Sequence, residues 1–194
     1  MKKNMILALL VAMLAIMPAA AEFGLGGSLS GLYSPAATME EMLARLLSGD
    51  GIFHGMFVEI GGKYTTFGAS FAWSNLLPGI GGNPFRDADR MMYIQGHLVG
   101  YKAMLDPFIE VGFGRLTRDY ANYIDDPDPF QPLTATRYLA GGGGLGLTAG
   151  RLNIFTKILY LVPAGQVTGW NGYPLEPYMT APTLKVLAGA KLVF

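Results

Sequence analysis

Hydrophobic residues alternate with small or polar residues along the last segment of the chain, TLKVLAGAKLVF, which runs from Thr183 to Phe194. One parity holds Leu184, Val186, Ala188, Ala190, Leu192 and Phe194, and the other holds Lys185 and Lys191. Because successive side chains of a strand point to opposite faces, this period of two predicts a β-strand with one apolar face. The same alternation occurs in EFGLGGSLSGLY from residue 22 and in PFIEVGFGR from residue 107.

The composition limits how such strands can be buried. Hydrophobic residues make up 51% of the chain and charged residues only 14%, whereas an ordinary soluble domain has about 25% charged residues. No segment after residue 21 offers the roughly 18 consecutive apolar residues that a transmembrane helix needs. An apolar chain without such helices favours strands that contact lipid.

The N-terminal segment has the three parts of a secretory signal peptide. Two lysines precede a short apolar run, Met5–Met17, and an Ala-x-Ala site ends at Ala21. The alternative is a retained anchor helix, but the apolar run is too short to span a bilayer. We therefore expect cleavage after Ala21 and a single exported domain formed by residues 22–194.

Segments with a period of two recur along this domain. The predicted strands are residues 22–33, 54–61, 64–75, 90–101, 106–116, 136–147, 151–162 and 182–194. Long connections (34–53, 76–89, 117–135 and 163–181) alternate with short ones (62–63, 102–105 and 148–150). Long loops on one side and short turns on the other, with both chain ends on the turn side, are typical of an up-and-down barrel in an outer membrane.

The polar face of these strands favours a barrel interior over a surface in water. It consists mostly of Gly, Ser and Thr, whereas a soluble barrel, the alternative, needs many surface charges. Eight strands enclose an interior just wide enough to be filled by side chains. The sequence therefore predicts an all-β fold, an eight-stranded antiparallel up-and-down transmembrane β-barrel with long extracellular loops and short periplasmic turns.

In this architecture the chain resembles the OmpA/OmpX-like eight-stranded outer-membrane barrels. The last strand of that family looks like VLAGAKLVF, with a terminal Phe after apolar residues at alternate positions. The resemblance implies an outer-membrane location in contact with lipid. It also implies that the barrel assembly machinery reads an insertion signal formed by Leu184, Val186, Leu192 and Phe194.

Parity assigns several ionisable residues to the barrel interior. They are Glu22, Glu59, His97, Glu110, Lys157, Lys185 and Lys191. Buried charges require partners, and the first and last strands must be neighbours to close the barrel. We therefore expect Glu22 and Lys191 to pair near the periplasmic end. Two interpretations remain open for the whole set: a structural network, or a gate whose ion pairs rearrange to admit ions.

We expect no catalytic, cofactor or metal site. The chain has no cysteine, which excludes thiolate ligands and thiol nucleophiles, and it has no basic cluster for nucleic acid. The lipid A deacylases, barrel enzymes of similar architecture, carry a His-x-Ser step, but here Met56 follows His54 and Val99 follows His97 at that spacing. Gly141–Gly146 fits G-x-G-x-x-G, but a further strand follows it, not the helix of a dinucleotide site.

Two of the long loops contain recognisable elements. Thr38 and Glu41 form a capping box at the start of an amphipathic helix that extends to Leu47. This helix would cover the barrel mouth, lie in the membrane interface or bind a partner. The third long loop concentrates carboxylates, at Asp119, Asp125, Asp126 and Asp128. Their spacing lacks the glycine and the last glutamate of an EF-hand, which favours a solvated acidic loop over a cation site.

Three functions are compatible with these features. The first is a non-enzymatic surface or envelope-structural protein whose loops bind host, phage or envelope components. The second is a narrow pore for small solutes or ions, and the third is a lipid-modifying enzyme. Because one fold hosts many functions, conductance in planar bilayers is the measurement that best separates the first two.

Overall fold

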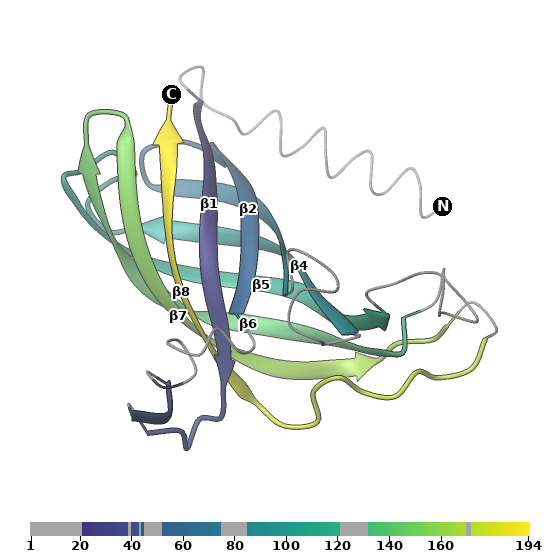
Figure 1. The fold of residues 1–194 in the computed structure, drawn as a ribbon. Helices are drawn as coiled ribbons and strands as arrows, with labels where there is room; N and C mark the ends of the chain where they lie inside the picture. Colours follow the sequence, from purple (N-terminus) through teal and green to yellow (C-terminus); the bar gives the residue numbers. More distant parts are fainter. Residues whose placement is uncertain are drawn as a thin grey trace, which may run out of the picture.

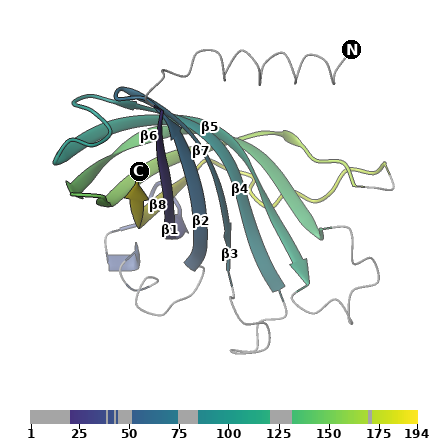
Figure 2. The same ribbon diagram turned by 90° about the horizontal axis from the view of Figure 1, so that it is seen from above.

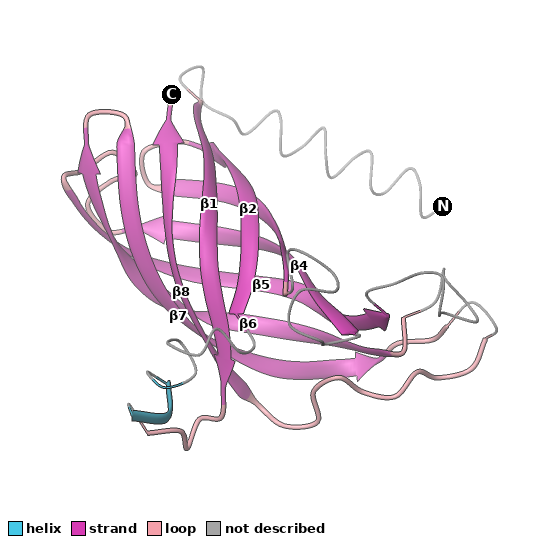
Figure 3. Cartoon of the chain, in the orientation of Figure 1, coloured by secondary structure: helices cyan, strands magenta, loops and turns pink. Residues whose placement is uncertain are grey.

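The computed structural model describes residues 21–38, 40–42, 44, 52–74, 85–120, 132–169 and 172–194. Apart from Ala21, the expected signal peptide lies outside these residues. Most of the described residues belong to strands and to the turns that join them (Figure 3). No helix in this part of the chain is long and apolar enough to cross a membrane.

Eight antiparallel strands close into a barrel in chain order, as predicted (Figure 1). They are β1 (Glu22–Tyr33), β2 (Ile52–Gly61), β3 (Thr65–Trp73), β4 (Phe85–His97), β5 (Leu105–Tyr120), β6 (Thr134–Ala149), β7 (Leu152–Gln166) and β8 (Thr183–Val193). The strands curve around one interior, as the turned view in Figure 2 shows. Closure comes from β1, where Leu29 is opposite both His54 of β2 and Ala188 of β8. Such closure leaves no unpaired sheet edge.

The fourth strand differs from its prediction. The sequence pattern predicts a strand over 90–101, but β4 begins at Phe85 and ends at His97. Leu98 and Val99 continue the apolar alternation, yet they lie in a turn. Gly100 has a φ of 143°, a backbone conformation that favours glycine. The apolar pattern thus extends past the strand because the turn itself contains large hydrophobic residues.

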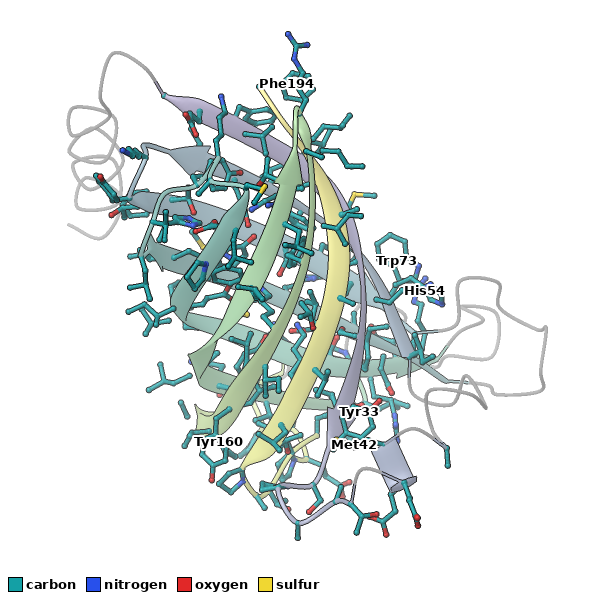
Figure 4. All side chains as sticks on the ribbon, turned by 90° about the vertical axis from the view of Figure 1, so that its left-hand side faces the viewer. Tyr33, Met42, His54, Trp73, Tyr160 and Phe194 are labelled. Carbon is teal, nitrogen blue, oxygen red and sulfur yellow. The ribbon has the colours of Figure 1, made fainter. Side chains whose placement is uncertain are left out.

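Outward-facing side chains form an apolar belt around the barrel. Exposed members are Phe23, Leu25, Leu29, Met56, Val58, Ile60, Phe71, Met92, Ile94, Ile109, Val111, Phe113, Leu139, Leu145, Leu147, Leu152, Ile154, Ile158, Tyr160, Val162, Leu192 and Phe194. Figure 4 shows Tyr160 and Phe194 projecting away from the strands near opposite ends of the barrel. Soluble monomers rarely expose a continuous apolar surface of this extent.

Glycines let large inward side chains approach the barrel wall. A Cβ on Gly144 would meet the ring of Phe108 at 2.6 Å, and one on Gly26 would meet the ring of Phe57 at 2.5 Å. The interior is therefore narrow, and aromatic rings occupy the space that these glycines leave.

The start of β1 and the end of β8 both lie at the turn side of the barrel (Figure 1). The backbone N–H of Phe194 donates to the carbonyl oxygen of Phe23 at 2.8 Å.

On the loop side, the Glu41 carboxylate accepts from the backbone N–H of Thr38 at 2.9 Å, while the Thr38 hydroxyl accepts from the backbone N–H of Glu41 at 3.2 Å. This is the predicted capping box. Only 40–42 and 44 of the predicted helix are described, and Asp125, Asp126 and Asp128 lie outside the described residues.

Candidate functional site

Three buried ion pairs cross the barrel interior. The pairs are Lys191–Glu59 at 2.6 Å, Lys157–Glu110 at 2.6 Å and Lys185–Asp89 at 2.5 Å between nitrogen and oxygen. No member is more than 5% exposed. The lysines come from β7 and β8 and the carboxylates from β2, β4 and β5, so each pair joins strands that are not neighbours. The three positive and three negative charges neutralise one another in pairs.

Further hydrogen bonds complete the solvation of Glu59. The hydroxyl of Tyr93 donates to one carboxylate oxygen at 2.9 Å, and that of Tyr101 donates to the other at 2.8 Å. The ammonium group of Lys191 also lies 4.3 Å from the centre of the Tyr101 ring. A buried ion pair recovers its desolvation cost only when its remaining polar atoms are satisfied. Glu59 meets this condition through two tyrosines.

The other two carboxylates are solvated in the same way. The amide nitrogen of Gln95 donates to Glu110 at 2.7 Å, and the hydroxyl of Tyr138 donates to Asp89 at 2.5 Å. The ammonium group of Lys157 lies 4.5 Å from the centre of the Tyr93 ring. Each carboxylate therefore has a lysine and at least one neutral donor.

Tyr101 covers the turn-side end of this network. It belongs to the turn between β4 and β5, yet it is 0% exposed because its side chain enters the barrel. A Cβ on Gly24 would overlap the Tyr101 hydroxyl, so only glycine leaves room for it there. Burial raises the pKa of the Tyr101 phenol far above its usual range, and the Glu59 carboxylate raises it further. The phenol therefore stays a hydrogen-bond donor.

A second buried cluster has the atom order of a hydrolase triad. His97 Nδ1 lies 2.7 Å from Asp106, and His97 Nε2 lies 3.0 Å from the hydroxyl of Thr66. The Thr66 hydroxyl is also 3.2 Å from the amide oxygen of Gln95. A nucleophile, a base and an orienting carboxylate in this order are the geometric signature of nucleophilic catalysis.

Two features of this cluster oppose catalysis. Thr66, His97 and Asp106 are all buried, at 0%, 4% and 1% exposure. Thr66 has one hydroxyl proton, and Gln95 must present its oxygen to Thr66 because its NH₂ group donates to Glu110. The hydroxyl proton of Thr66 is thus donated to Gln95 and is not presented to His97 for abstraction.

The fourth long loop covers the loop-side end of the barrel. Arg118 forms a bidentate ion pair with Asp87, at 2.7 and 3.0 Å. The hydroxyl of Tyr178 in the loop donates to the same carboxylate at 2.9 Å. Burial and the Asp87 carboxylate both raise the pKa of the Tyr178 phenol. The next residue, Met179, donates its backbone N–H to the Thr136 hydroxyl at 3.0 Å and packs with inward-facing residues of the barrel.

Glu22 occupies a different environment from the other predicted interior residues. It lies 3.5 Å from Lys102, with both side chains partly exposed. The predicted pairing of Glu22 with Lys191 is therefore wrong. The register of β1 and β8 places Gly26, not Glu22, opposite Lys191, which extends across the lumen to Glu59 instead.

Sequence reasoning missed two interior carboxylates, Asp89 and Asp106. Asp89 falls in the predicted second loop because the fourth strand is predicted five residues too late. Asp89 shares its parity with Tyr93 and His97, and Asp106 shares its parity with Glu110. Extending the fourth strand along this parity could have identified Asp89, while Asp106 already belonged to the predicted strand 106–116 and only needed to be assigned by parity.

Comparison with known proteins identifies the fold. No protein-family model matches the chain, and no curated protein matches its sequence. The N-terminal β-barrel domain of Pseudomonas aeruginosa OprF matches with a TM-score of 0.56 and 9% identity, over 89% of this chain and 97% of that one. Neisserial surface protein A (NspA) matches with a TM-score of 0.53 and 8% identity, over 90% of this chain and 97% of that one. The fold is that of the eight-stranded outer-membrane barrels.

Proposed function

We propose that the protein is an integral outer-membrane barrel whose interior is closed and whose extracellular loops carry its function, in adhesion or in contacts within the envelope. It acts as a non-enzymatic surface or structural protein. The apolar belt supports the membrane location, because water-exposed hydrophobic surface of this size is costly. The closed interior supports a role for the loops rather than for the lumen.

The observation that carries this proposal is the stack of neutralised ion pairs. Tyr101 covers the pair of Lys191 and Glu59 on the periplasmic side, and Met179 packs over the interior on the loop side. An ion crossing the barrel would have to separate a desolvated pair and leave both charges unpartnered. Breaking such a pair costs about 3–5 kcal/mol. The network therefore acts as a structural plug rather than a gate.

Planar-bilayer recording tests the closed interior. We expect no steady unitary current from the refolded barrel, while a general porin added to the same bilayers conducts. Steady currents whose size changes in a Glu110→Gln/Lys157→Met variant would contradict the proposal. That result would favour the alternative function, a narrow pore for ions or small solutes.

Complementation of a deletion strain tests the role of the loops. Tyr173 is 71% exposed near the tip of the fourth long loop, and we expect Tyr173→Ala or a Gly-Ser replacement of residues 170–173 to abolish surface adherence or envelope integrity. The charge-neutral variant Glu110→Gln/Lys157→Met should complement as the native protein does. The reverse pattern, with only the lumen variant failing, would assign the function to the interior.

We further propose that the outward row of β8 is the insertion signal read by the barrel assembly machinery. The row is formed by Leu184, Val186, Leu192 and Phe194. Phe194→Asp should strongly reduce the amount of inserted barrel in cells. The folding cost of a charge near an interface is only about 0–1 kcal/mol, so the variant should still refold in detergent and show the usual mobility shift on heating. Normal outer-membrane levels of the variant would refute the assembly role.

Export by a leader cleaved after Ala21 completes this proposal. Glu22 is the first residue of β1, so cleavage there leaves the first strand intact. Mass spectrometry of the membrane-inserted protein should show Glu22 as its N-terminal residue. A protein that retains the apolar run would instead support the anchor-helix alternative.

A further inference from the structure

Three arginines lie side by side on the outer face of the barrel. Arg90 of β4 is opposite Arg115 of β5, and Arg115 is opposite Arg137 of β6. All three share the parity of outward apolar residues on their strands, such as Met92 and Phe113. Because neighbouring strands are about 4.8 Å apart, the three positions span about 10 Å. We call Arg90, Arg115 and Arg137 the arginine row.

No ion pair between described residues neutralises the arginine row. Among the described residues, none of the three forms an ion pair with a carboxylate. The outward carboxylate of β5, Asp119, lies four residues beyond Arg115 and opposite Arg86. Its charge acts on Arg115 from a distance, without an ion pair between the two side chains. Like charges directly opposite one another destabilise a sheet. A negatively charged ligand would relieve this repulsion.

One donor atom of the arginine row lacks a hydrogen-bond partner among the described residues. The Nε atom of Arg115 is buried and has no hydrogen-bond partner within the described part of the chain. The guanidinium group of Arg90 lies 5.3 Å from the centre of the Phe71 ring, which positions it over the wall. Arginine offers a planar set of donors that suits phosphate oxygens. The guanidinium groups of the row therefore favour phosphate as the ligand group.

The row lies at the outer edge of the apolar belt. Along β5, the outward residues from Phe113 to Leu105, at the periplasmic turn, carry no charge. Ten residue steps separate Arg115 from Leu105, about 33 Å of strand, which a tilt of about 40° reduces to a height of about 25 Å. This is the thickness of the apolar band of such barrels. The guanidinium groups thus stand at the level of the outer-leaflet headgroups.

An open groove of about 590 Å³ continues from the row into the belt. Its lining combines the arginine row with Phe71, Met92, Phe113 and Leu139. Phe71 lies level with Arg90, while Met92, Phe113 and Leu139 lie one outward position beneath the arginines. Charged groups above apolar side chains are the arrangement that an amphiphile requires. Three cationic side chains aligned over about 10 Å suit a headgroup that carries more than one anionic group.

We propose that this groove binds a phosphorylated glycolipid of the lipid A type, with its phosphate groups on the arginine row and an acyl chain on the apolar side chains below. The proposal goes beyond the role of the loops and depends only on the outer-membrane location. Its test uses purified protein, so a negative result would leave the closed interior and the assembly signal untouched.

Native mass spectrometry of the refolded barrel in zwitterionic detergent tests this site. The probes are hexa-acylated lipid A with two phosphates, its monophosphoryl form, and phosphatidylglycerol. We expect a one-to-one complex with the bisphosphorylated lipid and weaker binding of the other two. Arg115→Gln should weaken the complex at least about tenfold, since a charge-assisted hydrogen bond typically contributes that much, and the triple variant Arg90→Gln/Arg115→Gln/Arg137→Gln should abolish it.

Arg151 provides the matched control. It is an exposed arginine in the periplasmic turn between β6 and β7, and Arg151→Gln should change the affinity by less than about twofold. The mobility shift of unheated samples verifies that each variant is folded. An unchanged affinity in Arg115→Gln, or an equal loss in Arg151→Gln, would refute the site. Equal affinity for phosphatidylglycerol would refute the glycolipid and leave a general attraction for anionic lipid.

Discussion

Neutralising one member of the Lys157–Glu110 pair should destabilise the barrel strongly, whereas neutralising both should not. Lys157→Met leaves the Glu110 carboxylate with Gln95 as its remaining donor. Glu110→Gln leaves the Lys157 ammonium group without its carboxylate partner in a buried site. In the double variant, neither position 110 nor position 157 carries a charge, and most of the side-chain volume at the two positions is preserved.

The expected magnitudes follow from burial. Removing one partner of a buried ion pair typically costs about 3–5 kcal/mol, while replacing both by residues of similar volume is close to neutral. Each single variant should therefore lose about 3–5 kcal/mol of unfolding free energy, and the double variant about 1 kcal/mol or less. The corresponding coupling energy in a double-mutant cycle is at least about 5 kcal/mol.

Urea unfolding of the refolded barrel in lipid vesicles, followed by tryptophan fluorescence, measures these free energies. Lys102→Met is the matched control, because Lys102 and Glu22 form a partly exposed pair at 3.5 Å. It should cost no more than about 1 kcal/mol. Added salt should weaken the contribution of the control pair and leave that of the buried pair almost unchanged.

Additive single variants, each costing less than about 1 kcal/mol, would refute the reasoning. Such a result would mean that water reaches Lys157 and Glu110 and screens them. It would also remove the main support for the closed interior. A costly double variant, in contrast, would show that specific packing of the charged groups matters more than their neutralisation.

Three further predictions concern glycine packing, topology and pH. Gly144→Ala places a methyl group against the Thr156 carbonyl oxygen and should lower the unfolding free energy by about 1–3 kcal/mol; Gly141→Ala, where no atom lies within 4 Å, should be tolerated in the same urea assay. Because the chain has no cysteine, a membrane-impermeant maleimide on intact cells should label Tyr173→Cys and not Lys102→Cys, and the opposite pattern would invert the topology. Since folding raises the pKa of Tyr178, its stabilising contribution should be complete below about pH 10 and lost above it, so Tyr178→Phe should flatten the alkaline decline in the thermal midpoint.

The sequence by itself determined the fold class and the side of the wall on which most residues lie. The alternation in β8 separates Lys185 and Lys191 from the apolar row ending at Phe194, and the structure preserves that separation. Low charge content and the alternation of long and short connections were enough to predict eight strands in a barrel. These signals are local, because parity depends only on the period of two along each strand.

Only the tertiary structure decided which inward and outward residues meet. Lys191 pairs with Glu59, 132 positions away, and not with Glu22. Tyr101 enters the barrel from a turn that the sequence pattern assigned to a strand. The arginine row exists only because the registers of β4, β5 and β6 align three outward positions. Periodicity fixes the face of a residue but not its register, and register emerges only when all eight strands close on one another.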